Sequence, residues 1–124
     1  MRKYGCWLLA AGMIGSISDA HAEQPKLDTT GDLVAYCDNV GPVGEIIRDG
    51  QNFCDGFIAG TGLLYLELVK AKKIKKLACA DPVPTLAEAR EAFVTWANAN
   101  PEHLSDAPID GFWRAMAASY PCSK

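Results

Sequence analysis

The stretch that decides the fold runs over residues 51–73, QNFCDGFIAGTGLLYLELVKAKK. Apolar side chains recur in it every three to four residues, at Phe53, Phe57, Leu64 and Leu68, which is the spacing of one helix face. Further apolar residues widen that face, namely Ile58, Leu63, Tyr65, Leu66 and Val69. A helix that is apolar on most sides is buried on most sides. We therefore expect this helix to be the centre of the fold, or also to face a second subunit.

Three glycines interrupt this helix, at Gly56, Gly60 and Gly62. Each costs about 1 kcal/mol relative to alanine in an exposed helix interior. Close packing of another backbone against the gaps is the expected compensation.

A run of lysines closes the helix, at Lys70, Lys72, Lys73, Lys75 and Lys76. Positive charge is favoured at this end of a helix by the helix dipole. A solvated helix terminus is the simpler interpretation. The alternative is a docking patch for an acidic partner or for anionic envelope polymers.

Three shorter helices are expected around the long one. The first covers residues 30–39, with Thr29 or Thr30 as its N-cap. The second follows Thr85-x-x-Glu88, which is a capping box, and stops before Pro101. Its buried face is expected to contain Leu86, Ala89, Phe93, Trp96 and Ala97. The third covers residues 108–119, with Asp106 as its cap and with Ile109, Phe112, Trp113, Met116 and Tyr120 facing inward. The sequence shows no alternation of apolar and polar residues that would indicate a strand. It therefore predicts an all-α, small four-helix domain whose helices pack orthogonally or as a bundle.

The N-terminus is typical of a secretory signal peptide. Arg2 and Lys3 precede an apolar run over residues 6–17, and residues 20–22, Ala-His-Ala, form a small-x-small cleavage pattern. The run is too short for a membrane span, which needs roughly 20 residues. We therefore expect a signal peptide over 1–22, a disordered segment over 23–29 and a single helical domain over 30–124. The mature protein is expected to be exported.

Cysteine usage agrees with export. Of five cysteines, Cys6 lies in the signal, so four remain. Four cysteines allow three pairings. We favour Cys37–Cys54 and Cys79–Cys122, because each of these bridges joins two element ends. Disulfides persist in the oxidising periplasm and are rare in the cytosol.

Charge and catalytic residue types narrow the function classes. The whole chain has 12 Lys and Arg and 15 Asp and Glu. The signal contains two of the basic residues and one of the acidic ones, so the mature chain keeps 10 basic and 14 acidic residues and has a net charge of −4. Mild acidity disfavours nucleic acid as the main partner. The mature chain keeps one histidine, His103, and has no Cys-x-x-Cys pair. We therefore predict no catalytic, cofactor or metal residues, and a protein that is not an enzyme.

Several short motifs together resemble one family. They are Leu33-Val34-Ala35-Tyr36-Cys37, Phe53-Cys54-Asp55-Gly56-Phe57-Ile58-Ala59-Gly60, Cys79 with Pro82, Phe93-Val94-Thr95-Trp96 with Asn100-Pro101-Glu102, and Ala117-Ala118-Ser119-Tyr120-Pro121-Cys122. In order and spacing they resemble the Rap/Tai family of type VI secretion immunity proteins over about residues 31–122. The resemblance implies an all-helical, often dimeric, periplasmic protein. It also implies a partner, a peptidoglycan amidase-type toxin that neighbouring cells inject.

The mechanism implied by the resemblance is occlusion of the toxin's cleft by a loop or a helix edge. Two segments are candidates for this role. The loop 38–52, between two paired cysteines, offers Asp38, Asn39, Glu45, Arg48, Asp49 and Gln51. The connection 99–110 offers Asn100, Glu102, His103 and Asp106, with Asp110 beside them. Each segment can equally be an ordinary solvated loop.

Two other function classes remain open. A small, helical, disulfide-bonded acid-stress chaperone is compatible with 14 acidic groups, although such chaperones usually carry one bridge. Acid-induced dissociation with a gain of client-holding activity would favour it. A hydrolase would need a nucleophile and a base. A reduced and reactive Cys54 would favour that class.

Overall fold

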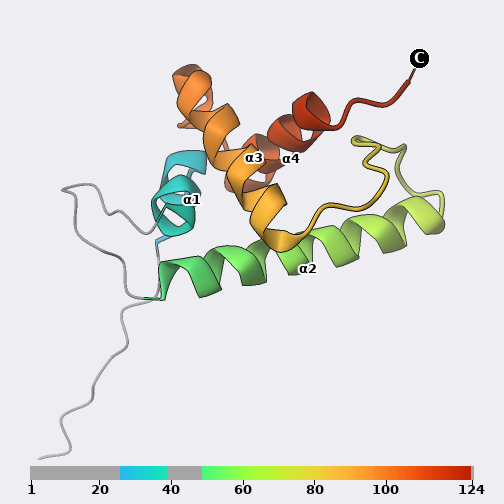
Figure 1. Ribbon diagram of the computed structural model, residues 1–124, viewed down its shortest axis with the longest axis horizontal. Coiled ribbons are helices and arrows are strands. Elements are labelled where there is room, and N and C mark those ends of the chain that lie inside the picture. Colours follow the sequence, from blue (N-terminus) through green and yellow to red (C-terminus); the bar gives the residue numbers. More distant parts are fainter. Residues whose placement is uncertain (1–25, 39–48, 124) are drawn as a thin grey trace, which may run out of the picture.

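The computed structural model describes residues 26–38 and 49–123. Within these ranges the chain forms four α-helices, one short 3-10 helix and no strand. The helices are α1 (Thr30–Cys37), α2 (Gly50–Lys70), α3 (Leu86–Ala99) and α4 (Pro108–Ser119), with η1 (Pro101–His103) after α3. α2 lies along one side, α1 stands at its N-terminal end, and α3 and α4 pack above it (Figure 1). The all-α, four-helix prediction is confirmed. The expected signal peptide lies outside the described residues.

Two helices begin where their local sequence requires. Thr29 accepts a hydrogen bond from the N–H of Asp32 at 3.1 Å, and the Asp32 carboxylate accepts one from the N–H of Thr29 at 2.9 Å. Thr85 and Glu88 form the same reciprocal pair before α3, at 3.2 and 2.7 Å. Each capping box satisfies backbone donors that a helix start leaves without partners. The predicted caps of α1 and α3 are confirmed.

The predicted cap of α4 is wrong. The N-cap residue is Ala107, which has no side-chain hydrogen bond, and Pro108 occupies the first helical turn. Proline suits this position because it has no N–H that needs a partner. The Asp106 carboxylate instead lies 2.7 Å from Nδ1 of His103.

α2 ends three residues before the predicted end at residue 73. Lys72 takes a left-handed conformation with φ of 54°. Its N–H donates to the Val69 carbonyl at 3.0 Å, and the N–H of Lys73 donates to the Leu68 carbonyl at 2.9 Å. These two bonds form a Schellman motif, a helix ending that usually has glycine at the left-handed position. Because residue 72 is lysine and not glycine, this helix end could not be predicted from the sequence.

Both predicted disulfides are present. Cys37 and Cys54 join the end of α1 to the start of α2, and Cys79 joins the segment after α2 to Cys122 after α4. Cys37 and Cys54 are buried in the core, whereas Cys79 is exposed. The rest of the core contains Leu33, Ile58, Ala89, Phe93, Ala97, Phe112, Ala115 and Met116.

A buried polar junction joins α1 to α4. Thr30 is fully buried, and its hydroxyl donates to the carbonyls of Asp106 and Ala107, both at 3.1 Å. Its N–H donates to the Asp106 carbonyl at 2.7 Å. Gly111 of α4 passes so close that a Cβ atom there would overlap the Thr30 side chain. Glycine is required at this crossing.

Several burial predictions are wrong. Leu86 and Ile109, predicted to face inward, are 42% and 46% exposed. Both lie in the first turn of their helix, ahead of the first buried residues of α3 and α4, which are Ala89 and Gly111. Within the described residues, no atom lies within 4 Å of a Cβ added at Gly56, Gly60 or Gly62. Residues 26–38 and 49–123 therefore do not supply the close packing that was expected against these glycines.

Candidate functional site

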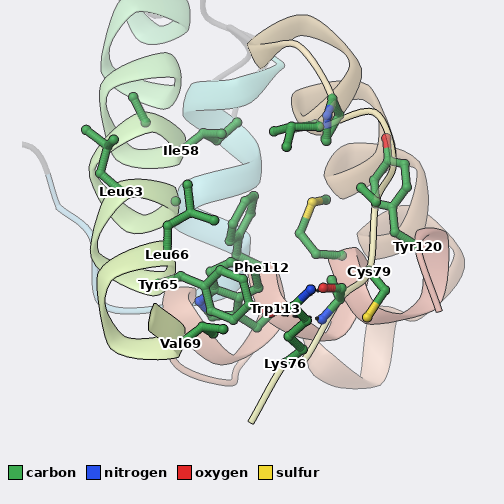
Figure 2. A pocket seen from close by; sticks show the side chains of 18 of the residues that line it. Ile58, Leu63, Tyr65, Leu66, Val69, Lys76, Cys79, Phe112, Trp113 and Tyr120 are labelled. Atoms are coloured by element: carbon green, nitrogen blue, oxygen red, sulfur yellow. Dashed lines mark hydrogen bonds between the residues drawn. The ribbon is translucent and has the colours of Figure 1, made fainter. Parts of the chain in front are cut away.

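An apolar groove opens between α2, α3, α4 and the connection after α2, which we call the strap (residues 71–85). The groove has a volume of about 480 Å³ (Figure 2). Its floor is buried and includes Ile58, Ala89, Phe112 and Met116. Its rim is formed by Leu63, Leu66, Val83 and Leu86, which are 67%, 51%, 73% and 42% exposed. Pockets of 300–1,000 Å³ with mainly apolar lining are typical binding sites.

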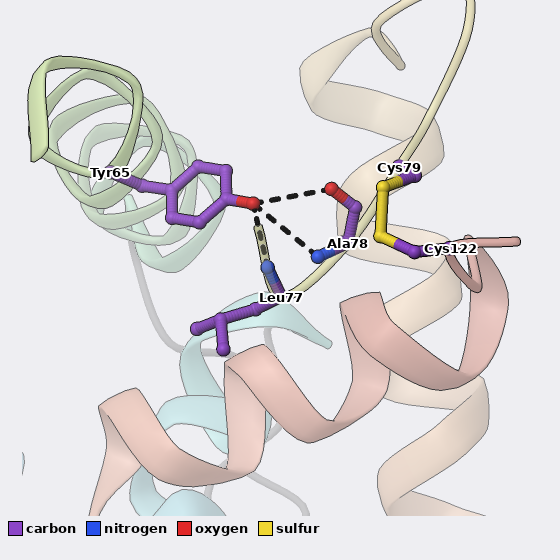
Figure 3. The surroundings of a disulfide bond; sticks show 5 residues. All are labelled: Tyr65, Leu77, Ala78, Cys79 and Cys122. Carbon is purple, nitrogen blue, oxygen red and sulfur yellow. Dashed lines mark hydrogen bonds between the residues drawn. A yellow bond between two sulfur atoms is a disulfide. The ribbon is translucent and has the colours of Figure 1, made fainter. Parts of the chain in front are cut away.

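The strap is held over the groove by one tyrosine and one disulfide. The Tyr65 hydroxyl accepts a hydrogen bond from the N–H of Leu77 at 2.9 Å and donates to the Ala78 carbonyl at 3.2 Å (Figure 3). Next along the strap, Cys79 is bonded to Cys122, and its N–H donates to the Tyr120 carbonyl at 2.8 Å. The Tyr65 ring also packs on Trp113, with ring centroids 4.3 Å apart. These contacts fix one wall of the groove.

The lysine run lies beside this wall. Lys70, Lys72, Lys73, Lys75 and Lys76 are all exposed, and Lys76 lines the groove. Lys70 lies 3.9 Å from Glu67. Within the described residues, the other four lysines form no ion pair with a carboxylate. The groove therefore combines an apolar interior with a basic margin.

The first predicted binding loop is described only at its ends. Asp38, Asp49 and Gln51 are exposed, whereas Asn39, Glu45 and Arg48 lie outside the described residues. With its amide oxygen turned toward Arg90, Gln51 accepts a hydrogen bond from Nη2 at 2.9 Å. Arg90 also pairs with Asp55 of α2. The Cys37–Cys54 disulfide brings the two ends of this loop together.

The second predicted segment uses most of its polar side chains internally. Asn100 donates to the Trp96 carbonyl at 2.7 Å, and the His103 ring stacks on Trp96 and contacts Asp106. Glu102 is exposed. Beside this segment, Asp110 accepts from Nε of Arg114 at 2.7 Å, and this hydrogen bond raises the pKa of Arg114. The structure thus separates an internal network from two exposed carboxylates, Glu102 and Asp110, of which Asp110 pairs with Arg114.

The described part of the chain shows the state of its thiols and of its metal-ligating side chains. Its four cysteines are all in disulfides, so Cys54 is not a reactive thiol. No cluster of three His, Cys, Asp or Glu residues among residues 26–38 and 49–123 is arranged to hold a metal ion. The described helices include none with the length and apolar character needed to cross a bilayer.

The architecture defines a class, a small disulfide-stapled helical binding protein with an open apolar groove. A model of the family described as Rap1a immunity proteins matches residues 29–122. The chain therefore belongs to the Rap1a immunity protein family, which indicates an immunity protein of a type VI secretion system with a toxin as its partner. Proteins of this family are generally not enzymes, and the two disulfides indicate an exported, periplasmic protein. No curated protein and no solved structure matches the chain.

Sequence reasoning did not find the groove. Its lining comes from three helices and the strap, so no single motif marks it. The only local signal was the excess of apolar residues on α2, which was interpreted as a subunit face.

Proposed function

We propose that this protein is a periplasmic immunity protein that binds and occludes a peptidoglycan amidase-type toxin delivered by a type VI secretion system. The family match over residues 29–122 is the observation that carries this proposal. The proposal includes export through the signal peptide 1–22, a disordered segment over 23–29 and a single helical domain over 30–124.

Occlusion is a matter of shape and rigidity, not of chemistry. A binding surface that is already ordered loses less entropy when the complex forms. The loop 38–52 suits this role because the Cys37–Cys54 bridge joins its ends and because Asp38 and Asp49 are exposed there, next to Gln51, whose amide oxygen faces Arg90. In the connection 99–110, Glu102 is the outward group, while Asn100, His103 and Asp106 hold the segment in shape. We propose these two segments as the candidates for entering the toxin's cleft.

We also propose that the protein is a homodimer through the outer face of α2. This face presents Leu64, which is 60% exposed, beside Gly56 and Gly60. The open space above both glycines allows the backbone of a second α2 to approach closely. A second copy would supply packing that the described residues do not supply at these positions. Substituting Leu64→Glu should therefore give a monomer in light scattering, with an unchanged far-UV circular dichroism spectrum.

The immunity function is tested by protection of living cells. The products of the genes next to this one are screened for peptidoglycan hydrolysis, and the hydrolase found is directed to the periplasm of a host cell, with and without the full chain. Lysis without the protein and normal growth with it are the expected results. The matched control is the chain without residues 1–22, which should not protect because it remains in the cytoplasm. Equal protection by both forms would contradict the periplasmic site of action.

A further inference from the structure

The basic-rimmed apolar groove has no assigned role in the immunity function. We propose that it anchors the toxin, and that its occupant is an amphipathic helix of the toxin with carboxylates beside its apolar face. This inference rests on the proposed function, and it adds a second contact to the occluding segment. It also names the chemistry that the toxin must present.

The rim of the groove is too apolar to be left in water. Leu63, Leu66 and Val83 are each more than half exposed, and they surround a floor that includes Phe112 and Met116. Single exposed apolar residues are normal, but a contiguous apolar surface marks an interaction site. The four rim residues come from α2, the strap and α3, so a partner that covers them must span the whole opening.

The length of the groove suits a helix. Ile58 and Val69 line it at eleven residues' separation on α2, which at 1.5 Å per residue is about 16 Å. About three turns of a partner helix have the same length. A helix lying there would place apolar side chains at i, i+3 or i+4, and i+7 into the groove, which is a recurrent mode of recognition.

The lysines specify the charge of that helix. Lys76 lines the groove, Lys72, Lys73 and Lys75 are exposed on the same strap, and within the described ranges none of the four pairs with a carboxylate. Complementary charges across an interface steer encounter and reject wrong partners. Two copies of this chain joined groove to groove would bring both lysine margins to one interface, because such a contact is self-complementary. Like charges there are unfavourable, so a different, acidic partner fits the groove better than a second copy.

The groove is already ordered before binding. Tyr65 holds the strap through Leu77 and Ala78, and the Cys79–Cys122 bridge fixes its next residue. A preformed wall reduces the ordering cost of association. The ordered strap therefore favours binding in the groove, because a flexible linker in its place would lose more entropy when a partner binds.

The test compares two leucines on different sides of α2. Leu66 lies on the groove rim, whereas Leu64 lies two residues away, about 200° around the helix. Binding of the purified hydrolase encoded beside this protein's gene is measured by calorimetry for the wild type, Leu66→Glu and Leu64→Glu. We expect Leu66→Glu to weaken binding about 30-fold or more, as loss of an interface hot spot does. Leu64→Glu should stay within about threefold per protomer and should change only the oligomeric state.

Charge is tested with the double variant Lys75→Glu, Lys76→Glu. Its association rate with the same hydrolase should fall about tenfold at low salt, and the difference should shrink as salt rises. Thermal melts of all variants establish that each one is folded. The Trp113 emission of the wild type should also change on binding, since Trp113 lines the groove.

Three results would overturn the inference. The first is that Leu66→Glu binds the hydrolase as tightly as the wild type does, while the association rate of the lysine variant does not depend on salt. The second is a change in oligomeric state as the only effect of Leu66→Glu, which would assign the groove to a second copy. The third is a bound amphiphile, seen by native mass spectrometry, that the hydrolase does not displace. Failure of the wild type to bind any such hydrolase would instead remove the proposed function, and the groove inference with it.

Discussion

The close contact between Gly111 of α4 and Thr30 of α1 makes a sharp prediction about stability. A Cβ atom at residue 111 would overlap Oγ1 and Cγ2 of Thr30 and would lie 2.9 Å from its Cβ. The obstacle is a fully buried side chain, fixed by hydrogen bonds from its hydroxyl to the carbonyls of Asp106 and Ala107. Substituting Gly111→Ala must therefore displace α4 or break these bonds.

The magnitude follows from two contributions. Overpacking of a filled site costs about 1–3 kcal/mol, and loss of one buried hydrogen bond costs about 0.5–1.5 kcal/mol. Together they predict a loss of about 2–4 kcal/mol in the free energy of unfolding. For a domain of this size each kcal/mol lowers the melting temperature by about 4–8 °C, so we expect a fall of roughly 8–30 °C.

Thermal unfolding followed by circular dichroism measures this effect. The matched control is Gly62→Ala, which places the same methyl group where no atom lies within 4 Å. It should raise the free energy of unfolding by up to about 1 kcal/mol, because alanine is the better helix former. The double variant Gly111→Ala, Thr30→Ala should lose less than the sum of the single losses, since both act at one contact. An unchanged or higher melting temperature for Gly111→Ala would refute the reasoning.

Three further predictions concern the ends of elements. Lys72→Gly should stabilise the protein by about 1 kcal/mol in chemical denaturation, because glycine adopts the left-handed conformation of residue 72 without steric cost; Lys73→Gly should not. Mild reductant followed by alkylation and peptide mass spectrometry should label Cys79 and Cys122 before the buried Cys37 and Cys54; the reverse order would contradict the burial described above. Hydrogen bonds from the N–H and hydroxyl of Thr85 hold the pKa of Glu88 below its ordinary 4.5. The ionised Glu88 carboxylate therefore stabilises the folded protein above that pH, and this stabilisation is lost as the pH falls through the lowered pKa of the folded state. Glu88→Gln should accordingly flatten the fall of melting temperature between about pH 5 and pH 3, and an unaltered pH profile would contradict this.

The sequence predicted most reliably what local chemistry determines. Thr85 and Glu88 are three residues apart, so their capping box can be recognised without knowledge of the rest of the chain. The disulfide pairing was also recovered, because each favoured bridge joins the ends of two elements. The helices themselves followed from apolar spacing.

The failures lie where tertiary contacts decide. Asp106 has the right residue type for a helix cap, but its carboxylate contacts the ring of His103, three residues before it, instead of a backbone N–H of α4. Leu86 and Ile109 have the right helical spacing for burial, but the helix ends project beyond their neighbours. The apolar excess of α2 was recognised, yet its division into a groove side at Leu66 and an outer side at Leu64 required the positions of α3, α4 and the strap.

The central claim, inhibition by stoichiometric occlusion, is tested most directly by a titration. The purified, oxidised mature protein is added in steps to a fixed amount of the peptidoglycan hydrolase encoded beside its gene, and digestion of peptidoglycan is followed. The account predicts a linear loss of activity that reaches zero at one protomer per hydrolase, with both proteins recovered intact. Full hydrolase activity at a severalfold excess of the protein would contradict it.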